Sequence, residues 1–277
     1  MKRFFKHVLT VMMVLVTCAV YTIPVLGEEQ WTVTKEGVKI WNQTHASDAS
    51  ASWSGSTDKN GYAEGDGLLQ WFVKDKPEEK YEGTMRKGRQ NGKGVYTWPN
   101  GDKFEGNFDD GRFKGKGVYT WSNGERYEGD FVKSKFHGKG VKTWASGARY
   151  EGDFVNGKRT GKAIYINSNG DRYEGDYIDG KFHGKGILAL ANGERYEGNF
   201  VDDKRTGKGV YTWPNGERYV GLFKDNIRNG KGVYTWPDGE KYDGEYVDGR
   251  RQGRGTFYYN NGKIDKGHWA DDEFVGP

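Results

Sequence analysis

A period of 23 residues governs most of this chain, and it limits the possible folds more than any other feature of the sequence. The period begins at Tyr81 and recurs eight times without slippage, over residues 81–264. Numbered from the leading ring, position 1 is Tyr or Phe in all eight repeats, and positions 3, 12 and 21 are always Gly. Position 14 is Gly in every repeat except the fourth, which has Ala163. An array of small, equivalent units is therefore predicted.

Each unit has the residue alternation of two short strands. Residues 127–131 alternate ring, acid, glycine, acid and ring, and residues 117–121 alternate glycine, aliphatic, ring, hydroxyl and ring; a period of two is that of a β-strand. Asn123-Gly124 is typical of a tight hairpin with positive φ, whereas positions 6 to 11 form a second, polar connection. We predict an all-β fold, an elongated single-layer antiparallel meander of 23-residue β-hairpin repeats. Each repeat would add about 10 Å.

The alternation also divides the side chains between two faces. Rings at positions 1, 5, 16 and 18 share one face with the glycines at positions 3, 12 and 14, which would leave room for rings over bare backbone. On the other face, the acids of position 2 are expected to form ion pairs with the bases of position 13, each worth under about 1 kcal/mol. The acids are Glu82, Glu105, Glu128, Glu151, Glu174 and Glu197, and the bases include Lys93, Lys116, Lys139 and Lys208.

These motifs resemble those of a known repeat family. Tyr-Glu-Gly-x-Phe, followed by Gly-Lys-Gly-Val-Tyr-Thr-Trp-Pro-Asn-Gly on a 23-residue period, is similar to the MORN repeat (membrane occupation and recognition nexus), over the whole of residues 81–264. Residues 53–80 are interpreted as a divergent repeat of the same kind, and residues 28–52 as an N-terminal capping segment. Residues 265–277 keep only the first strand and are expected to form a partial repeat and C-terminal cap.

Residues 1–27 are a different kind of sequence. Three basic residues precede an apolar run over residues 8–20, and Pro24 and a small residue, Gly27, follow. This is the layout of a secretory signal peptide cleaved before Glu28. We therefore expect an exported bacterial member of the MORN-repeat family, periplasmic or extracellular.

Two other fates of the N-terminus are compatible with its sequence. Residues 8–26 could remain as a membrane anchor, and Cys18 could carry a lipid. Cys18 is the only cysteine, so a chain cleaved after Gly27 has none and holds neither a disulfide nor a thiolate zinc site. Cleavage also removes three bases and leaves 40 basic and 39 acidic residues. A nearly neutral protein is a poor ligand for nucleic acid or anionic membranes.

No group of residues in the sequence forms a catalytic or metal-binding pattern. His137 and His183, both at position 11, are two repeats apart and would lie roughly 20 Å from each other, too far to share a metal ion. The position-2 glutamates are numerous and equivalent, which favours a solvated ladder over a general acid. No helix follows the repeated Gly-x-Gly, so it is not a nucleotide-binding loop. We predict no catalytic residues, no metal and no cofactor.

The tyrosines and tryptophans at positions 16 and 18 are the candidate binding face. They are Tyr96, Trp98, Tyr119, Trp121, Trp144, Tyr211, Trp213, Tyr234 and Trp236. The alternative interpretation is that these rings form the core of a sheet too thin to have another. Repeats four and five interrupt the pattern, with Asn167, Leu188 and Leu190 in place of rings.

A long, neutral array of this kind predicts a non-catalytic scaffold for protein–protein interaction or assembly in the cell envelope. The alternative is lipid or membrane-surface binding, which the family name implies, or binding of cell-wall glycan by the aromatic face. Exposed end strands would also allow oligomers to form by edge pairing.

Overall fold

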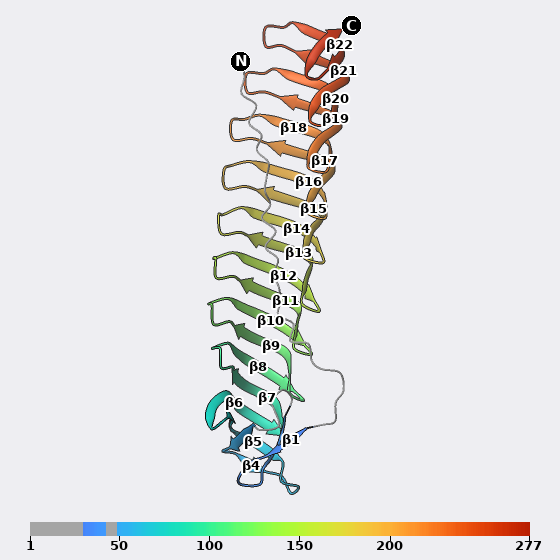
Figure 1. Ribbon diagram of the computed structural model, residues 1–277. Coiled ribbons are helices and arrows are strands. Elements are labelled where there is room, and N and C mark those ends of the chain that lie inside the picture. Colours follow the sequence, from blue (N-terminus) through green and yellow to red (C-terminus); the bar gives the residue numbers. More distant parts are fainter. Residues whose placement is uncertain (1–29, 43–48) are drawn as a thin grey trace.

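The computed structural model describes residues 30–42 and 49–277, which form strands joined by turns (Figure 1). Within these residues there is no helix long and apolar enough to cross a membrane. Residues 1–27, for which a signal peptide is predicted, lie outside the described residues. The N-terminal strands are β1 (Trp31–Val33), β2 (Lys39–Trp41), β3 (Ser50–Trp53), β4 (Ser56–Thr57), β5 (Ala63–Val73) and β6 (Lys76–Arg86).

Each repeat contributes two strands, the first repeat sharing β6, and the last two strands follow the eighth repeat. The strands after β6 are β7 (Arg89–Thr97), β8 (Lys103–Asp109), β9 (Arg112–Thr120), β10 (Arg126–Val132), β11 (Lys135–Thr143), β12 (Arg149–Val155), β13 (Lys158–Ile166), β14 (Arg172–Ile178), β15 (Lys181–Ala189), β16 (Arg195–Val201), β17 (Lys204–Thr212), β18 (Arg218–Lys224), β19 (Ile227–Thr235), β20 (Lys241–Val247), β21 (Arg250–Tyr258), β22 (Ile264–Ala270) and β23 (Glu273–Gly276).

Strands β1 and β2 form a separate two-stranded sheet. The others form one long antiparallel sheet in which each strand from β5 onward pairs with the next. Strands β3 and β4 share the free side of β5. The N-terminal strands β4 and β5 lie at one end of the elongated molecule and β22 at the other, so the sheet is open (Figure 1). The predicted all-β, elongated antiparallel meander is confirmed.

The two kinds of turn differ from the sequence prediction. The tightest turn occupies positions 7 and 8, where Lys133 and Ser134 both have positive φ, 49° and 62°, as in a type I′ hairpin. The strand therefore resumes at position 9, inside the segment predicted to be a polar connection. The Asn-Gly site is instead a three-residue loop in which only Gly124 has positive φ, 87°; Gly124 N–H donates to Trp121 O at 3.0 Å.

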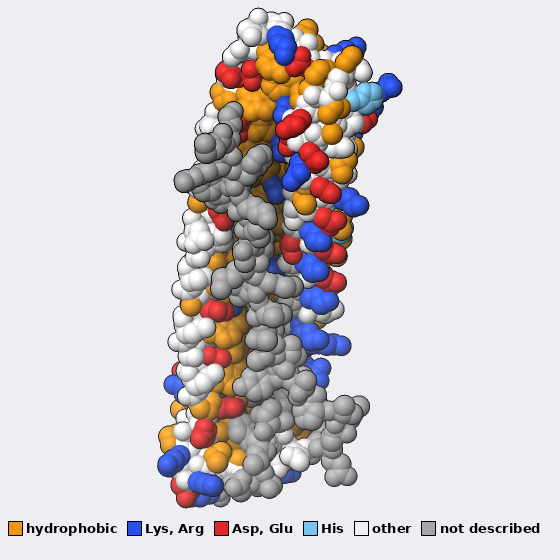
Figure 2. Space-filling model, turned by 45° about the horizontal axis from the view of Figure 1, so that its top comes forward, with side chains coloured by type: hydrophobic (Ala, Val, Ile, Leu, Met, Phe, Trp, Pro, Cys, Tyr) orange, Lys and Arg blue, Asp and Glu red, His pale blue; other side chains and the backbone are white. Residues whose placement is uncertain are grey.

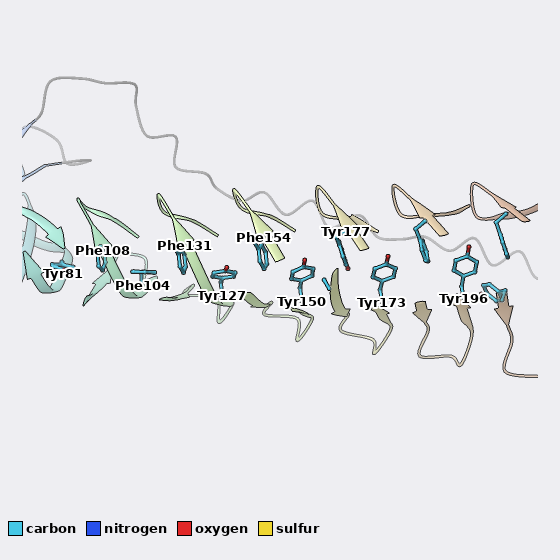
Figure 3. Close-up of a cluster of buried hydrophobic side chains, with 14 of the residues drawn as sticks. Tyr81, Phe104, Phe108, Tyr127, Phe131, Tyr150, Phe154, Tyr173, Tyr177 and Tyr196 are labelled. Atoms are coloured by element: carbon cyan, nitrogen blue, oxygen red, sulfur yellow. The ribbon is translucent and has the colours of Figure 1, made fainter. Parts of the chain in front are cut away.

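A sharp bend in each first strand brings its rings together. Residues four apart on a straight strand are about 13 Å apart, yet the rings of Tyr127 and Phe131 have centroids 5.2 Å apart. The bend lies at Gly129, where the register with β11 shifts. The sheet is thus folded toward its ring side, and the rings of positions 1 and 5 point at each other across the fold (Figure 3).

The conserved glycines serve two different purposes in this bend. A Cβ on Gly140, at position 14, would lie 2.5 Å from the hydroxyl oxygen of Tyr127, so this glycine makes room for a ring as predicted. Gly138, at position 12, instead has a φ of +57°. It lies in a β-bulge, since Gly138 and Lys139 have no partner on β10, and its positive φ is a conformation that favours glycine. The expectation that position 12 also makes room for a ring is therefore corrected.

The core consists of two facing rows of rings along the inside of the fold, one from position 1 and one from position 5 (Figure 3). The position-1 rings are 0 or 1% exposed: Tyr81, Phe104, Tyr127, Tyr150, Tyr173, Tyr196, Tyr219 and Tyr242. Each meets a position-5 ring of the following repeat edge to face, as Tyr127 meets Phe154 at 5.1 Å. In the partial repeat at the C-terminal end, Trp269 occupies the position-5 site and contacts Tyr242 at 5.2 Å.

The charged face carries ion pairs, but between other partners than predicted. The register places Lys139, at position 13, opposite Asp153 at position 4 of the next repeat, and their charged groups are 2.8 Å apart. Glu151, at position 2, lies opposite an aliphatic residue and pairs instead with Arg149, two residues earlier, at 2.6 Å. The predicted ladder between positions 2 and 13 is therefore wrong in its partners, because the sequence does not specify the register between strands.

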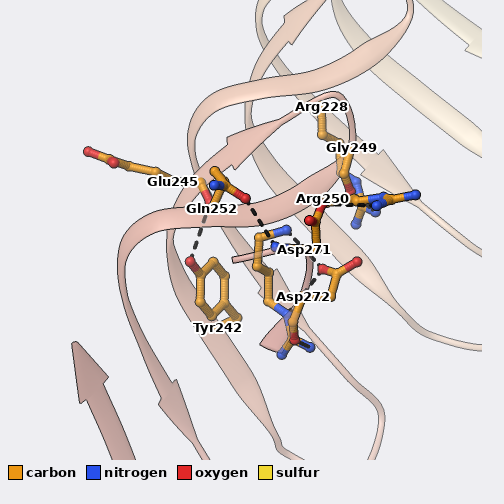
Figure 4. Close-up of polar contacts among 9 residues, drawn as sticks. Arg228, Tyr242, Glu245, Gly249, Arg250, Gln252, Asp271 and Asp272 are labelled. Carbon is orange, nitrogen blue, oxygen red and sulfur yellow. Dashed lines mark hydrogen bonds and ion pairs between the residues drawn. The ribbon is translucent and has the colours of Figure 1, made fainter. Parts of the chain in front are cut away.

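Neighbouring hairpins are also locked together at the position-7 and position-8 turns. At the C-terminal end, Arg250 pairs with Asp271 at 2.9 Å, and the Asp272 carboxylate accepts a hydrogen bond from Arg251 N–H at 2.8 Å (Figure 4). Equivalent ion pairs link Lys158 to Asp179 and Lys204 to Asp225, both at 3.0 Å. Charges of opposite sign consequently alternate along the edge of the sheet that these turns form. Hydrophobic side chains lie between this edge and the opposite edge (Figure 2).

Candidate binding face

The rings at positions 16 and 18 form two continuous ladders along one arm of the folded sheet. In each repeat, the ring at position 16 comes from the end of the second strand and the ring at position 18 starts the three-residue loop. The N-terminal ladder comprises Tyr96, Trp98, Tyr119 and Trp121, with successive centroids 4.7, 5.2 and 4.6 Å apart. The C-terminal ladder comprises Tyr211, Trp213, Tyr234, Trp236, Phe257 and Tyr259, with spacings of 4.5 to 5.3 Å.

The ladders contain eight of the nine residues predicted for the binding face. The ninth, Trp144, lies beyond the N-terminal ladder and meets Tyr165 edge to face at 5.9 Å. The C-terminal ladder also includes Phe257 and Tyr259, which sequence reasoning missed. The 23-residue period could have identified them, because they occupy positions 16 and 18 of the eighth repeat.

A carboxylate at position 22 of the preceding repeat fixes each ladder tyrosine at position 16. Tyr234 donates its hydroxyl hydrogen to Glu217 at 2.7 Å, and Tyr211 donates to Glu194. Burial, together with the neighbouring Glu194 carboxylate, raises the pKa of Tyr211 to about 12. The tyrosines are therefore neutral, and both their hydroxyls and these carboxylates are already engaged.

The tryptophans of position 18 are different, because their polar atoms are free. Trp53 and Trp269 donate their indole N–H groups to backbone carbonyls, at 2.8 and 3.2 Å. Across residues 30–42 and 49–277, no acceptor lies within hydrogen-bonding distance of the other set: Trp98, Trp121, Trp144, Trp213 and Trp236. Their rings are partly exposed and pack on the core. The ladders thus present ring surface and hydrogen-bond donors together.

The middle of the array separates the ladders. In repeat three, Lys142 takes the position-16 site; its ammonium lies 2.5 Å from Glu125 and 3.2 Å from the centroid of Trp121, with the residue only 6% exposed. This buried cation replaces both the tyrosine ring and its hydrogen bond. Asn167 of repeat four bonds to Asp171 at 2.8 Å. The interruption was predicted for repeats four and five, but it begins already at Lys142 in repeat three, which sequence reasoning missed.

Position 10 lies beneath the ladders and was assigned to a polar connection from the sequence. In repeat two it is Phe113, which stacks on Phe104 with centroids 3.7 Å apart and planes at 11°. In repeat seven it is Arg228, whose guanidinium lies 5.2 Å from the Tyr234 ring and donates to Gly249 O at 2.8 Å. A flat aromatic ring or a flat guanidinium can therefore fill the same site.

The structure contains no group of three or more His, Cys, Asp or Glu side chains placed to hold a metal ion within its described part. The two histidines at position 11, His137 and His183, lie opposite Asp130 and Asp176 in separate hairpins.

The repeat boundaries can be compared with those of known families. The model for the MORN repeat matches eight consecutive units: residues 81–103, 104–126, 127–149, 150–172, 173–195, 196–218, 219–241 and 242–264. The chain belongs to the MORN-repeat family. Its MORN array thus accounts for strands β7 to β21 and most of β6. A search of curated proteins finds no match to the chain.

Some solved structures show partial similarity. The TCP domain of Drosophila melanogaster SAS-4, in complex with a proline-rich motif of Ana2, is 18% identical, with a TM-score of 0.35 over 54% of this chain and 82% of that one. The TCP10 domain of Danio rerio CPAP, in complex with a peptide of STIL, is 14% identical, with a TM-score of 0.41 over 80% of this chain and 100% of that one.

Proposed function

We propose that this protein is a non-catalytic scaffold that holds an extended segment of a partner protein along its two aromatic ladders, in the cell envelope. One observation carries the proposal: the position-18 tryptophans combine partly exposed rings with indole N–H groups that have no acceptor in the described ranges 30–42 and 49–277. Tryptophan and tyrosine dominate the binding energy of protein interfaces. A surface of fixed rings also loses little side-chain entropy on binding.

The charges of the molecule favour a protein partner over a phosphate-rich one. On the face opposite the rings, bases such as Lys116 and Lys139 already pair with carboxylates at 2.8 to 2.9 Å. The ladder tyrosines are bordered by further carboxylates, which would repel an anionic lipid surface. MORN repeats and repetitive sheets of this kind are typical of binding scaffolds rather than enzymes. The envelope location rests on the signal-like sequence of residues 1–27 alone.

The experiment is affinity capture from native envelope extract, using protein expressed from the full-length sequence. The test variant, Trp213→Ala/Trp236→Ala, should lose the captured partner, because each substitution removes a large interface ring, a change that typically costs about 2 kcal/mol or about 30-fold in affinity. The matched control, Val201→Ala/Val247→Ala, truncates two exposed apolar side chains at position 6 and should capture as well as wild type.

Two further arms identify the alternatives. Flotation with anionic vesicles at physiological salt reports lipid binding, and tryptophan fluorescence with soluble cell-wall fragments reports glycan binding. A partner that the double variant retains, or tryptophan-dependent binding to vesicles or glycan alone, would contradict the proposal.

A further inference from the structure

We infer that the C-terminal aromatic ladder takes a proline-rich segment in the polyproline II conformation, with one turn of the segment seated on each repeat. This inference rests on the proposed function and specifies the chemistry of the partner. It follows from the pitch of the repeats, from the hydrogen-bond donors of the ladder and from the length of the ladder.

The pitch of the array matches that of polyproline II. A polyproline II helix has three residues per turn and rises about 3.1 Å per residue, so each turn advances about 9.3 Å. Each MORN repeat contributes two strands, which advance the sheet by about 9.4 to 9.8 Å. Equivalent rings such as Trp213 and Trp236 therefore recur once per turn of the ligand. An α-helix, with a pitch of about 5.4 Å, and a β-strand, which repeats about every 6.8 Å, lose this register within one repeat.

The hydrogen-bonding groups of the ladder also match a proline-rich backbone. The indole N–H groups of Trp213 and Trp236 are donors that have no acceptor among residues 30–42 and 49–277. A proline-rich backbone supplies acceptors for them, because its polyproline II carbonyls form no internal hydrogen bonds.

The lengths of the two ladders decide which ladder is the principal binding site. The C-terminal ladder runs through repeats six, seven and eight, from Tyr211 to Tyr259, without a gap. Its partly exposed position-18 rings, Trp213, Trp236 and Tyr259, therefore offer three turns of contact, or about nine residues of ligand. The N-terminal ladder spans two repeats and ends at the buried Lys142–Glu125 pair. The ligand class is thus a segment with prolines spaced at intervals of three.

The test compares two twelve-residue peptides, (Pro-Pro-Ala)4 and (Pro-Pro-Ala-Ala)3, by tryptophan fluorescence and calorimetry with the full-length protein. We expect the period-three peptide to bind at least fivefold more tightly, because only its prolines recur with the same spacing as the repeats. Trp213→Ala/Trp236→Ala should weaken binding at least tenfold. Trp236→Phe, which keeps a ring but lacks the N–H, should weaken it about threefold to tenfold, as expected for one hydrogen bond.

The outcomes separate this inference from the proposed function. Equal affinity for both peptides, or no binding of either while envelope capture still depends on Trp213 and Trp236, would overturn the polyproline assignment and leave the scaffold intact. Loss of tryptophan-dependent capture would overturn the scaffold itself. Thermal unfolding of each variant, together with the milder Trp236→Phe change, excludes misfolding as the cause of lost binding.

Discussion

The two aromatic ladders both have partly exposed rings at position 18 but different supports. Beneath the N-terminal ladder, position 10 is Phe113 in repeat two, stacked at 3.7 Å on Phe104. Beneath the C-terminal ladder, position 10 is arginine in all three repeats, and Arg251, for example, lies 5.4 Å from Phe257 and 4.6 Å from Trp269. The comparison teaches that an aromatic ring and a guanidinium can serve as alternative supports at this site.

The two supports also place different charges near the buried tyrosines. Burial raises the pKa of Tyr219 to about 12, and the guanidinium of Arg228 beside it opposes that shift. Tyr127, stacked on Phe136 at 3.7 Å, has no such cation, and burial raises its pKa well above the usual value. The arginines thus add positive charge beneath the rings at the site we assign to the proline-rich ligand.

The largest expected effect comes from closing the glycine site that both ladders share. A Cβ on Gly232 would lie 2.4 Å from the Tyr219 hydroxyl oxygen, and one on Gly117 would lie 2.7 Å from the Phe104 ring. Gly232→Val and Gly117→Val should each reduce the free energy of unfolding by about 3 kcal/mol, measured by urea unfolding. Wild-type stability in either variant would mean that the ring does not lie on the backbone as described.

A smaller effect is expected when the flat group is removed from position 10. Arg228→Ala should destabilise the protein by about 2 kcal/mol, because it empties the ring site and leaves the Gly249 carbonyl without its donor. Arg228→Phe should recover most of this loss by stacking on Tyr219, as Phe136 stacks on Tyr127. If the Phe variant is as unstable as the Ala variant in urea, the two supports are not equivalent.

The difference in ladder length can be sharpened by one substitution. Lys142→Tyr replaces the buried ammonium with the ring that the repeat normally has and gives Glu125 a hydroxyl donor in its place. The N-terminal ladder would then extend to Trp144 and span three repeats. In a Trp213→Ala/Trp236→Ala background, which isolates this ladder, affinity for (Pro-Pro-Ala)4 should rise by about threefold to tenfold. An unchanged affinity would show that ladder length does not set binding.

The smallest expected effect is a pH dependence at Asp102 of the N-terminal ladder. Burial opposes ionisation of Asp102, but hydrogen bonds from Ser122 N–H at 2.8 Å and Tyr119 at 3.1 Å hold the pKa of its carboxyl below the usual value. A lowered pKa stabilises the fold above the unfolded value of about 3.9, and this contribution disappears as pH falls through the folded pKa.

Asp102→Asn should therefore be less stable than wild type at pH 7 by about 1 kcal/mol or less. The difference should shrink as pH falls from about 5 to about 2. Urea midpoints at both pH values provide the measurement. A constant difference across this range would show that the Asp102 carboxylate does not carry the effect.

The repeat, its strands and the division of side chains between faces were predictable, because a period of 23 residues and an alternation of two are visible in one chain. The bend at Gly129 was not, since the sequence gives no direct sign of a bulge or of the register across it. The same uncertainty in register misassigned the partners of Glu151 and Lys139. The role of Arg228 was missed because the sequence alone does not distinguish an arginine that packs in an aromatic site from one that is exposed to solvent.

The most direct test of the central claim is oxidative footprinting of the protein in native envelope extract with its partner bound. Oxidation of Trp213 and Trp236 should slow by at least threefold relative to the free protein. Oxidation of Val201 and Val247, exposed at position 6, should not change. A bound partner that leaves both tryptophans as reactive as in the free protein, while protecting side chains of the charged face, would contradict the assignment of the aromatic ladders as the binding surface.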